Sequence, residues 1–196
     1  ARKLKATKPE IKTCFVGSHT SALPMEVISL KEVDFILLNE GVYALQNLLR
    51  TDLVSSLDKV RGIGHKQSGA PVLNAPEMVV LNDRMDMDLP GYAWDLLPYK
   101  NKPLDLYRAH FWHAEFNHDL RTPFAAIYTS LGCKFKCDFC MINIVNRTDN
   151  SDGVVSANSP NMRFWSPQFM VKEFEKLAAM GAKTIRVSDE MFFLNK

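Results

Sequence analysis

The chain of 196 residues is poor in the features that mark several large classes of protein. No apolar stretch approaches the ~20 residues that a membrane-spanning helix needs, so we expect no membrane span. The net charge is only +2, which gives no strong field for nucleic acid or for a membrane surface. Internal repeats and low-complexity tracts are also absent from the sequence. What remains is a globular chain long enough for one large or two small domains.

Cysteine is scarce as well: the chain has four, and only one Cys-x2-Cys step. Two such steps, or one step followed by histidines, are typical of zinc sites. A zinc site completed by His110, His113 or His118 is therefore a less favoured alternative. The chain begins with a basic run rather than a signal peptide, which disfavours a disulfide framework. We expect reduced cysteines and a cytoplasmic location.

Three of the cysteines lie close together in the run Gly-Cys-Lys-Phe-Lys-Cys-Asp-Phe-Cys, as Cys133, Cys137 and Cys140. The intervals of three and then two residues let their thiolates turn onto one small inorganic group, and such thiolates hold iron–sulfur clusters. A [4Fe–4S] cluster takes four ligands, so three cysteines leave one iron open. An open iron suits catalysis, because it can bind a substrate or cofactor. Cys14 lies in a short apolar run and is expected to be a buried structural thiol.

The first third of the chain alternates strand and helix patterns. Residues 13–17 and 34–38 predict buried strands, and residues 24–32 and 42–50 predict helices. Residues 60–65 and 71–74 flank Gln-Ser-Gly and predict a hairpin. This alternation is typical of a parallel α/β sheet.

Ligands of such sheets bind beyond the carboxyl ends of the strands. In this chain those ends are the loops Gly17-Ser18-His19-Thr20 and Asn39-Glu40-Gly41. Both loops are small, polar and glycine-bearing, so their backbone can approach a flat cofactor closely. Ordinary loop chemistry is the alternative.

A second α/β segment is predicted after a connector rich in proline, aspartate and aromatic residues. Residues 123–129 predict a strand that runs directly into the cysteine loop. Ser166 and Pro167 predict the start of a helix that ends at Gly181, and residues 183–188 predict the next strand. Strand, loop, helix, strand is one turn of an α/β barrel. The apolar stripe expected to face the core of this segment is Met170, Phe174, Leu177 and Ala178.

The cysteine run resembles the Cys-x3-Cys-x2-Cys signature of radical S-adenosylmethionine (radical SAM) enzymes, including the aromatic residue, here Phe139, before the last cysteine. The resemblance implies that the methionine moiety of S-adenosylmethionine chelates the open iron of a [4Fe–4S] cluster. It also implies that polar residues at the end of the next strand hold the methionine amino group. The corresponding residues are Ser188, Asp189 and Glu190; Glu190 is preferred and Asp189 is the fallback. A strand-end acid that caps a turn is the alternative.

The front segment resembles the second half of the cobalamin-binding domain that precedes many radical SAM domains. The resemblance rests on Gly-Ser-His-Thr-Ser-Ala-Leu-Pro and Val-Asp-Phe-Ile-Leu-Leu-Asn-Glu-Gly, and Leu-Pro-Gly-Tyr-Ala-Trp-Asp at residues 89–95 resembles the linker between the two domains. His19 does not match the Asp-x-His-x-x-Gly axial motif and is not the axial ligand. The implied cobalamin contacts are Gly17, His19, Thr20, Glu40 and Gly41.

The implied fold class is α/β, with a partial flavodoxin-like (Rossmann-type) parallel sheet followed by the first strands of a partial TIM-type radical SAM barrel. The implied divisions are residues 1–76 for the end of a cobalamin-binding-like domain, 77–120 for a linker, and 121–196 for the start of a radical SAM domain. Only two strands and one helix fit after residue 123, so we expect the chain to be incomplete for catalysis.

The implied activity is reductive cleavage of S-adenosylmethionine, with cobalamin-dependent methyl transfer or related radical chemistry on a small molecule. An external electron donor of flavodoxin or ferredoxin type is implied, and no catalytic residue is assigned beyond the cluster. A cobalamin-free radical SAM enzyme, such as an RNA methylthiotransferase, is one alternative. Three further cysteines are expected in its front domain, where this chain has only Cys14. A non-enzymatic metal-binding module is the other alternative.

Overall fold

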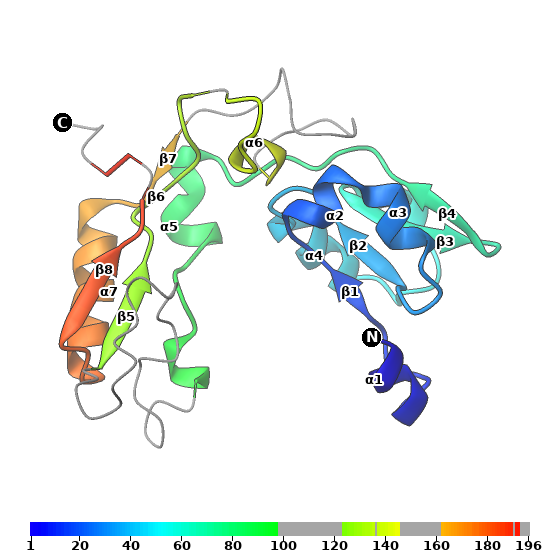
Figure 1. Cartoon of the computed structure of the whole chain (residues 1–196), viewed down its shortest axis with the longest axis horizontal. Helices are drawn as coiled ribbons and strands as arrows, with labels where there is room; N and C mark the ends of the chain where they lie inside the picture. The colour runs from blue at the N-terminus through cyan, green and yellow to red at the C-terminus, as the bar shows by residue number, and fades with distance from the viewer. Residues whose placement is uncertain (98–122, 136, 146–161, 190, 193–196) are drawn as a thin grey trace. The chain divides into compact units, whose positions relative to one another are not determined.

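The computed structural model describes residues 1–97, 123–135, 137–145, 162–189 and 191–192 (Figure 1). The chain forms two compact units. The first combines Ala1–Val80 with Gly132–Asn161, and the second combines Leu81–Leu131 with Met162–Lys196. Within the described part of the chain, we find no helix with the length and apolar character needed to cross a membrane.

The first unit is built on a four-stranded sheet in the order β1-β2-β3-β4. β1 (Cys14–Phe15) is parallel to β2 (Phe35–Leu37), with Cys14 opposite Phe35. β3 (Ile63–Gln67) is antiparallel to β2 and forms a hairpin with β4 (Ala70–Leu73), as Figure 1 shows. The structure therefore has the predicted strands and hairpin, but the predicted parallel sheet is only partly present: β1 and β2 are parallel, whereas β3 and β4 are antiparallel to their neighbours, so the sheet is mixed.

The segment between α4 (Val42–Leu49) and β3 sets the direction of β3. Residues 50–62, which include the short helix η1 (Leu57–Lys59), return the chain to the end of β2, where Leu38 N donates to Gly62 O at 2.9 Å. The buried side-chain amide of Asn74 holds this return by donating to the carbonyl oxygens of Leu57 at 2.6 Å and Val60 at 2.7 Å. β3 therefore starts from the end of the sheet where β2 stops, and it runs the opposite way.

Strand β2 is buried on both faces because helices cover each side of it. Successive side chains of a strand point to opposite faces. Phe35 and Leu37 pack with Ala44, Leu48, Val60 and Ile63 in one apolar cluster on the α4 side. Ile36 and Leu38 pack with residues of α3 (Pro24–Ser29) and the turn after it, namely Val27, Ile28 and Val33. The helix α2 (Ser18–Ala22) precedes α3, and α1 (Arg2–Thr7) buries no residue.

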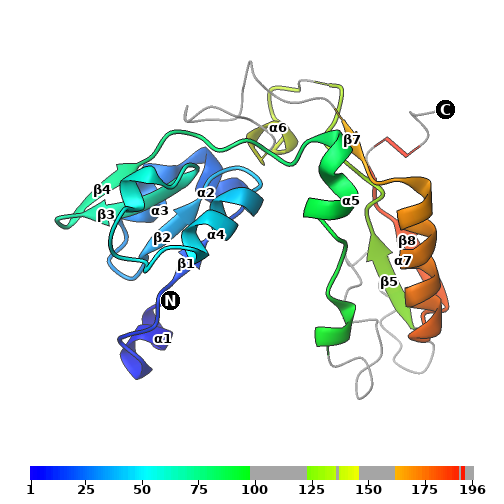
Figure 2. The ribbon, with the colours of Figure 1, turned by 180° about the vertical axis from the view of Figure 1, so that it is seen from behind.

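The second unit contains a parallel pair of strands joined through a helix. β5 (Phe124–Ile127) pairs with β8 (Thr184–Val187), and Ala125 lies opposite Ile185. The helix α7 (Pro167–Ala179) lies beside this pair in Figures 1 and 2. β6 (Ser130–Leu131) forms a small antiparallel pair with β7 (Arg163–Phe164). The predicted strand–helix–strand order is present, whereas two parallel strands do not establish a TIM-type barrel.

Helix α7 has the predicted capping residues at both ends. Ser166 Oγ accepts a hydrogen bond from Phe169 N at 3.1 Å, Pro167 occupies the first turn, and Gly181 follows the helix with a φ of +95°. The predicted core stripe is only partly right, because Met170 and Leu177 are buried but Ala178 is exposed. Glu173 takes a buried position instead, where its carboxylate accepts a hydrogen bond from Trp94 Nε1 at 3.3 Å.

The connector from residue 82 to residue 97 packs within the second unit. It carries η2 (Asn82–Arg84), α5 (Met85–Asp88) and η3 (Trp94–Leu96). Its oxygens accept hydrogen bonds from the chain around β7: Asn82 Oδ1 from Phe164 N, and Leu89 O from Trp165 Nε1 at 2.7 Å. At the end of β5, Tyr92 Oη accepts a hydrogen bond from Tyr128 N at 3.3 Å. The connector is therefore part of the second unit's packing.

The Asn74 hydrogen bonds give a stability prediction for the first unit. Asn74→Ala leaves two carbonyl oxygens without their donor and is expected to lower the free energy of unfolding by about 2 kcal/mol. Hydrogen exchange at the amides of β2 and β3 measures this, because the tryptophans of the chain lie outside this unit. Gln46→Ala, on the exposed side of α4, is the matched control and should change the same amides by less than about 0.5 kcal/mol. Equal effects of the two substitutions would contradict the role given to Asn74.

Candidate functional site

The cysteine loop follows β6 and leaves its thiols accessible. Cys137 is exposed, Cys133 and Cys140 are half-buried, and none of the three forms a disulfide among the described residues. A turn brings the last two together in the backbone, since Cys140 N donates to Cys137 O at 3.0 Å. Phe139, within this turn, is 90% exposed. The loop thus presents sulfur donors and two aromatic rings, those of Phe135 and Phe139, at the surface of the protein.

The chemistry of these donors fits an iron–sulfur cluster. Three thiols within one short loop are the ligand type that such clusters use, and none of them is enclosed in an apolar core. The loop does not gather them into a preformed site: among the described residues, no group of three or more His, Cys, Asp or Glu side chains is placed to hold a metal ion. Binding of a cluster would therefore reorganise the loop around it.

Cys14 does not occupy the position predicted for it. The residue is exposed on β1, so the prediction of a buried structural thiol is wrong. β1 is an edge strand, and nothing in the described residues pairs with its outer side. Partial burial of the thiol nevertheless raises the pKa of Cys14 to about 11. The thiol therefore stays protonated at neutral pH, which makes it a poor thiolate ligand.

The carboxylate of Asp189 fixes the strand end that leads into the cysteine loop. Its Oδ1 accepts a hydrogen bond from Thr129 N at 2.7 Å. Its Oδ2 accepts from Thr129 Oγ1 at 2.5 Å and from Ser130 Oγ at 2.7 Å. Hydrogen bonds to a carboxylate are among the strong ones in proteins. Asp189 follows β8, so it ties the end of that strand to the connection between β5 and β6.

Of the other two residues predicted to bind S-adenosylmethionine, the structure describes one, Ser188. Ser188 is half-buried, and its backbone N donates to Ile127 O at 2.9 Å, which leaves its hydroxyl at the end of the strand. Glu190, the preferred residue, lies outside the described part of the chain. The carboxylate oxygens of Asp189 already have three donors from the protein itself, so Asp189 acts on its surroundings mainly through Thr129 and Ser130.

Sequence reasoning did not single out Thr129 or Ser130, whereas side-chain alternation along residues 183–188 placed Arg186 with Ser188 and Glu190 on one polar face. The signal for the first two is a pair of consecutive hydroxyl residues between a strand and a cysteine loop. Arg186 lies on β8 opposite Ala126, on the face that carries Ser188. Its Nη1 is buried and has no hydrogen-bond partner in the described part of the chain. A buried guanidinium nitrogen without a partner can bind a carboxylate or another anion.

At the carboxyl end of β1 and β2, two loops adopt backbone conformations that favour glycine. Gly17 has a φ of +128° and Gly41 a φ of +73°. A Cβ at Gly41 would lie 3.0 Å from Leu37 Cβ, so a larger residue would press on the core. The space around Gly17 is open. These loops therefore present backbone, as the sequence predicts for contact with a flat ligand.

Some side chains of these loops are exposed, whereas others are buried or already hydrogen-bonded within the protein. The side chain of His19 is 66% exposed and lies 3.8 Å from Glu26 Oε1. Thr20 is buried, and Glu40 Oε2 accepts a hydrogen bond from Val80 N at 2.8 Å. Of the five residues predicted to contact cobalamin, Gly17, His19 and Gly41 are accessible, whereas Thr20 and Glu40 contribute to packing and to a loop anchor.

The segment after the cysteines contacts one of these loops. The helix α6 (Ile142–Val145) begins two residues after Cys140 and contacts α2, which carries His19 and Thr20. Both helices belong to the first unit, and Figure 1 labels both. The chain therefore places the downstream end of the cysteine segment next to the helix that starts at the carboxyl end of β1.

No family model matches the chain. It is 26% identical to an uncharacterised methyltransferase of Pyrococcus horikoshii, over 92% of this chain and 33% of the relative. The fold is similar to that of the radical S-adenosylmethionine methyltransferase TsrM from Kitasatospora setae in two structures. The structure with tryptophan substrate and the analogue aza-SAM gives a TM-score of 0.54 at 18% identity, over 92% of this chain and 30% of that one.

The structure of TsrM with cobalamin and a [4Fe–4S] cluster gives a TM-score of 0.55 at 17% identity, over 98% of this chain and 34% of that one. The chain thus spans about a third of the length of the relative and of both TsrM chains. All of these are methyltransferases, and the structural likeness establishes a shared fold.

The hydrogen bonds of Asp189 give a second prediction. Asp189→Asn replaces one acceptor oxygen by an amide that cannot accept from Thr129 or Ser130, so the second unit should lose about 2 kcal/mol of stability. Urea unfolding followed by tryptophan fluorescence measures this, since Trp94 and Trp165 belong to that unit. Asp83→Asn, on the exposed helix η2, is the control and should leave the unfolding midpoint unchanged. An unchanged unfolding midpoint for Asp189→Asn would show that the hydrogen bonds of Asp189 do not stabilise the second unit.

Proposed function

We propose that this chain is part of a radical SAM enzyme that uses cobalamin, with methyl transfer as its reaction class. The observation that carries the proposal is the Cys133, Cys137, Cys140 spacing in a chain whose fold is similar to that of a radical SAM methyltransferase. The methyltransferase relative supports the reaction class. Residues 1–76 would belong to the cobalamin-binding part and residues 121–196 to the radical SAM part, with a linker between them.

In this proposal the three thiolates would hold a [4Fe–4S] cluster, whose chemistry when bound would be the one-electron reduction of S-adenosylmethionine. Phe139 provides an apolar surface beside the ligands. Ser188 and Glu190 bind the methionine amino group. Asp189 is a positioning residue, because its hydrogen bonds to Thr129 and Ser130 fix the strand that enters the cysteine loop.

The front loops would hold the corrinoid. Gly17 and Gly41 provide backbone that a flat ring can approach, and His19 provides an exposed imidazole beside them. Thr20 and Glu40 support the loops from behind, through burial and through the hydrogen bond to Val80. The contact between α6 and α2 supports the idea that cysteine segment and loops serve one reaction.

A flavodoxin-type or ferredoxin-type protein would deliver the electron, the substrate would be a small molecule, and the protein would act in the cytoplasm. A radical SAM enzyme without cobalamin is the second candidate. It is favoured by one observation, namely that two of the five residues predicted to contact cobalamin are occupied within the protein itself.

Replacement of single cysteines tests the cluster. After anaerobic reconstitution with iron and sulfide, Ala in place of Cys133, Cys137 or Cys140 should abolish both the visible absorption of the cluster and the cleavage of S-adenosylmethionine. Cys14→Ala is the matched control and should retain the cluster, because the Cys14 thiol is protonated at neutral pH. Bound iron and acid-labile sulfide are measured for each variant, so cluster assembly is scored apart from turnover. Loss of the cluster in Cys14→Ala would overturn the three-ligand assignment.

Substitution of a loop glycine tests the corrinoid site. Gly17→Leu should reduce retention of hydroxocobalamin about tenfold or more in equilibrium dialysis, because the side chain would project where the ring approaches. Gly69→Leu is the control: Gly69 also has a positive φ, +84°, and open space around it, but it lies in the β3–β4 hairpin. Both variants place leucine at a glycine with a positive φ, so a difference between them reports the site once circular dichroism shows that both are folded. Unmeasurable binding by the unmodified chain would favour the cobalamin-free candidate.

A further inference from the structure

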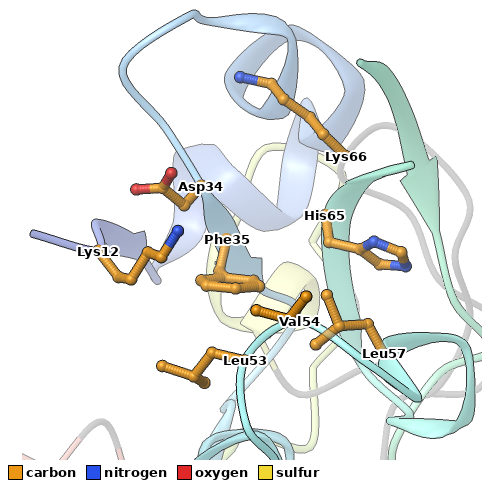
Figure 3. A pocket seen from close by; sticks show the side chains of 8 residues that line it. All are labelled: Lys12, Asp34, Phe35, Leu53, Val54, Leu57, His65 and Lys66. Carbon is orange, nitrogen blue, oxygen red and sulfur yellow. The ribbon is translucent and has the colours of Figure 1, made fainter. Parts of the chain in front are cut away.

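A pocket of about 240 Å³ opens at the amino end of β2, shown in Figure 3. Its apolar wall includes Phe35 of β2 and Leu53 and Leu57 of the segment that follows α4. The loops at residues 17–20 and 39–41 lie at the other end of the same strands. Strands rise about 3.3 Å per residue, so roughly 15 Å of sheet separates Asp34 from Asn39. The pocket is therefore distinct from the proposed corrinoid edge.

His65 lines this pocket with an imidazole that has no partner of its own. The register of β2 and β3 places His65 beside Phe35 on the same face of the sheet. His65 is only 4% exposed, and neither ring nitrogen has a hydrogen-bond partner in the described part of the chain. Neutral imidazole carries one donor and one acceptor, and buried polar groups are normally paired. Both ring nitrogens are themselves covered, so a ligand in the pocket would supply the missing partner once the imidazole turns toward it.

The charged groups around the pocket leave an excess of positive charge. The single carboxylate among the lining residues, Asp34, is already paired with Lys5 at 2.6 Å. Lys66 donates to the carbonyl oxygens of Leu30 at 2.7 Å and Val33 at 2.9 Å, so no carboxylate neutralises it. Lys12 is exposed and has no ion pair in the described part of the chain. An anion at the pocket mouth would therefore be attracted.

We propose that this pocket binds a small carboxylate that carries one aromatic ring or a short alkyl chain. The apolar body would lie against Phe35, Leu53 and Leu57. The carboxylate would accept a hydrogen bond from His65 and an ion pair from Lys12. The size agrees, because an apolar cavity of about 150 Å³ admits benzene, and this pocket is larger by enough for a carboxyl group. The proposal does not depend on the radical SAM assignment.

Benzoate is the probe, and nuclear magnetic resonance of the ¹⁵N-labelled chain is the measurement. Benzoate should shift the amides of residues 53–57 and 63–66 and the imidazole nitrogens of His65 in a saturable way. Benzamide, its neutral counterpart, and benzylamine, its cationic counterpart, should bind at least about fivefold more weakly, because each lacks the ion pair with Lys12. Of the three probes, only benzoate should bind more weakly when salt is added.

Two variants locate the site. Lys12→Ala should lower the affinity for benzoate about fivefold. Lys8 is an exposed lysine outside the lining, so Lys8→Ala should leave this affinity unchanged. His65→Phe removes the imidazole N–H donor and should lower the affinity for benzoate about tenfold. If His65→Phe does not fold, the affinity of Lys12→Ala for benzoate tests the proposal by itself. The proposal is overturned if benzoate leaves these amides unshifted, if benzamide binds as tightly, or if Lys12→Ala matches Lys8→Ala.

Discussion

Burial of β2 on both faces is the constraint on which the first unit depends. Phe35 and Leu37 face one apolar cluster, Ile36 and Leu38 face another, and no side chain of the strand is left for solvent. A strand buried this way forces polar groups to its ends, where the chain must turn. Both candidate ligand sites of this unit follow from that rule. The loops proposed to hold the corrinoid lie where β2 leaves the core, and the His65 pocket lies where β2 enters it.

Acidic residues near the proposed sites are used chiefly to hold loops in place. Asp189 joins the end of β8 to Thr129 and Ser130, and Glu40 joins the end of β2 to the backbone at Val80. Each carboxylate accepts hydrogen bonds from groups that would otherwise lack a partner at a chain turn. Preorganisation of this kind favours catalysis and binding, since loops that are already ordered lose less entropy when a ligand arrives. An acid at a strand end is therefore evidence of a shaped loop before it is evidence of a ligand contact.

Local sequence patterns were sufficient to predict most helices and strands. They failed where contacts between residues distant in the sequence determine strand direction or burial. The apolar runs at β1 and β2, the Ser166-Pro167 start of α7 and the hairpin could be predicted because each depends on neighbours in sequence. The direction of β3 could not, since it depends on Asn74 holding Leu57 and Val60. The burial of Glu173 in place of Ala178 depends on Trp94, 79 residues away. The spacing of Cys133, Cys137 and Cys140 was visible at once, whereas the His65 pocket needs three segments to be brought together.

The hydrogen bond between Tyr92 and Tyr128 has a consequence for how the second sheet can grow. One side of β5 is paired with β8, and on the other side a phenol oxygen, instead of a neighbouring strand, satisfies the amide of Tyr128. An edge closed in this manner resists addition of a further strand. The outer side of β8 has no such closure in the described residues. Tyr92 therefore hinders a further strand from pairing at the carboxyl end of β5, whereas the outer edge of β8 has no strand beside it in the described residues.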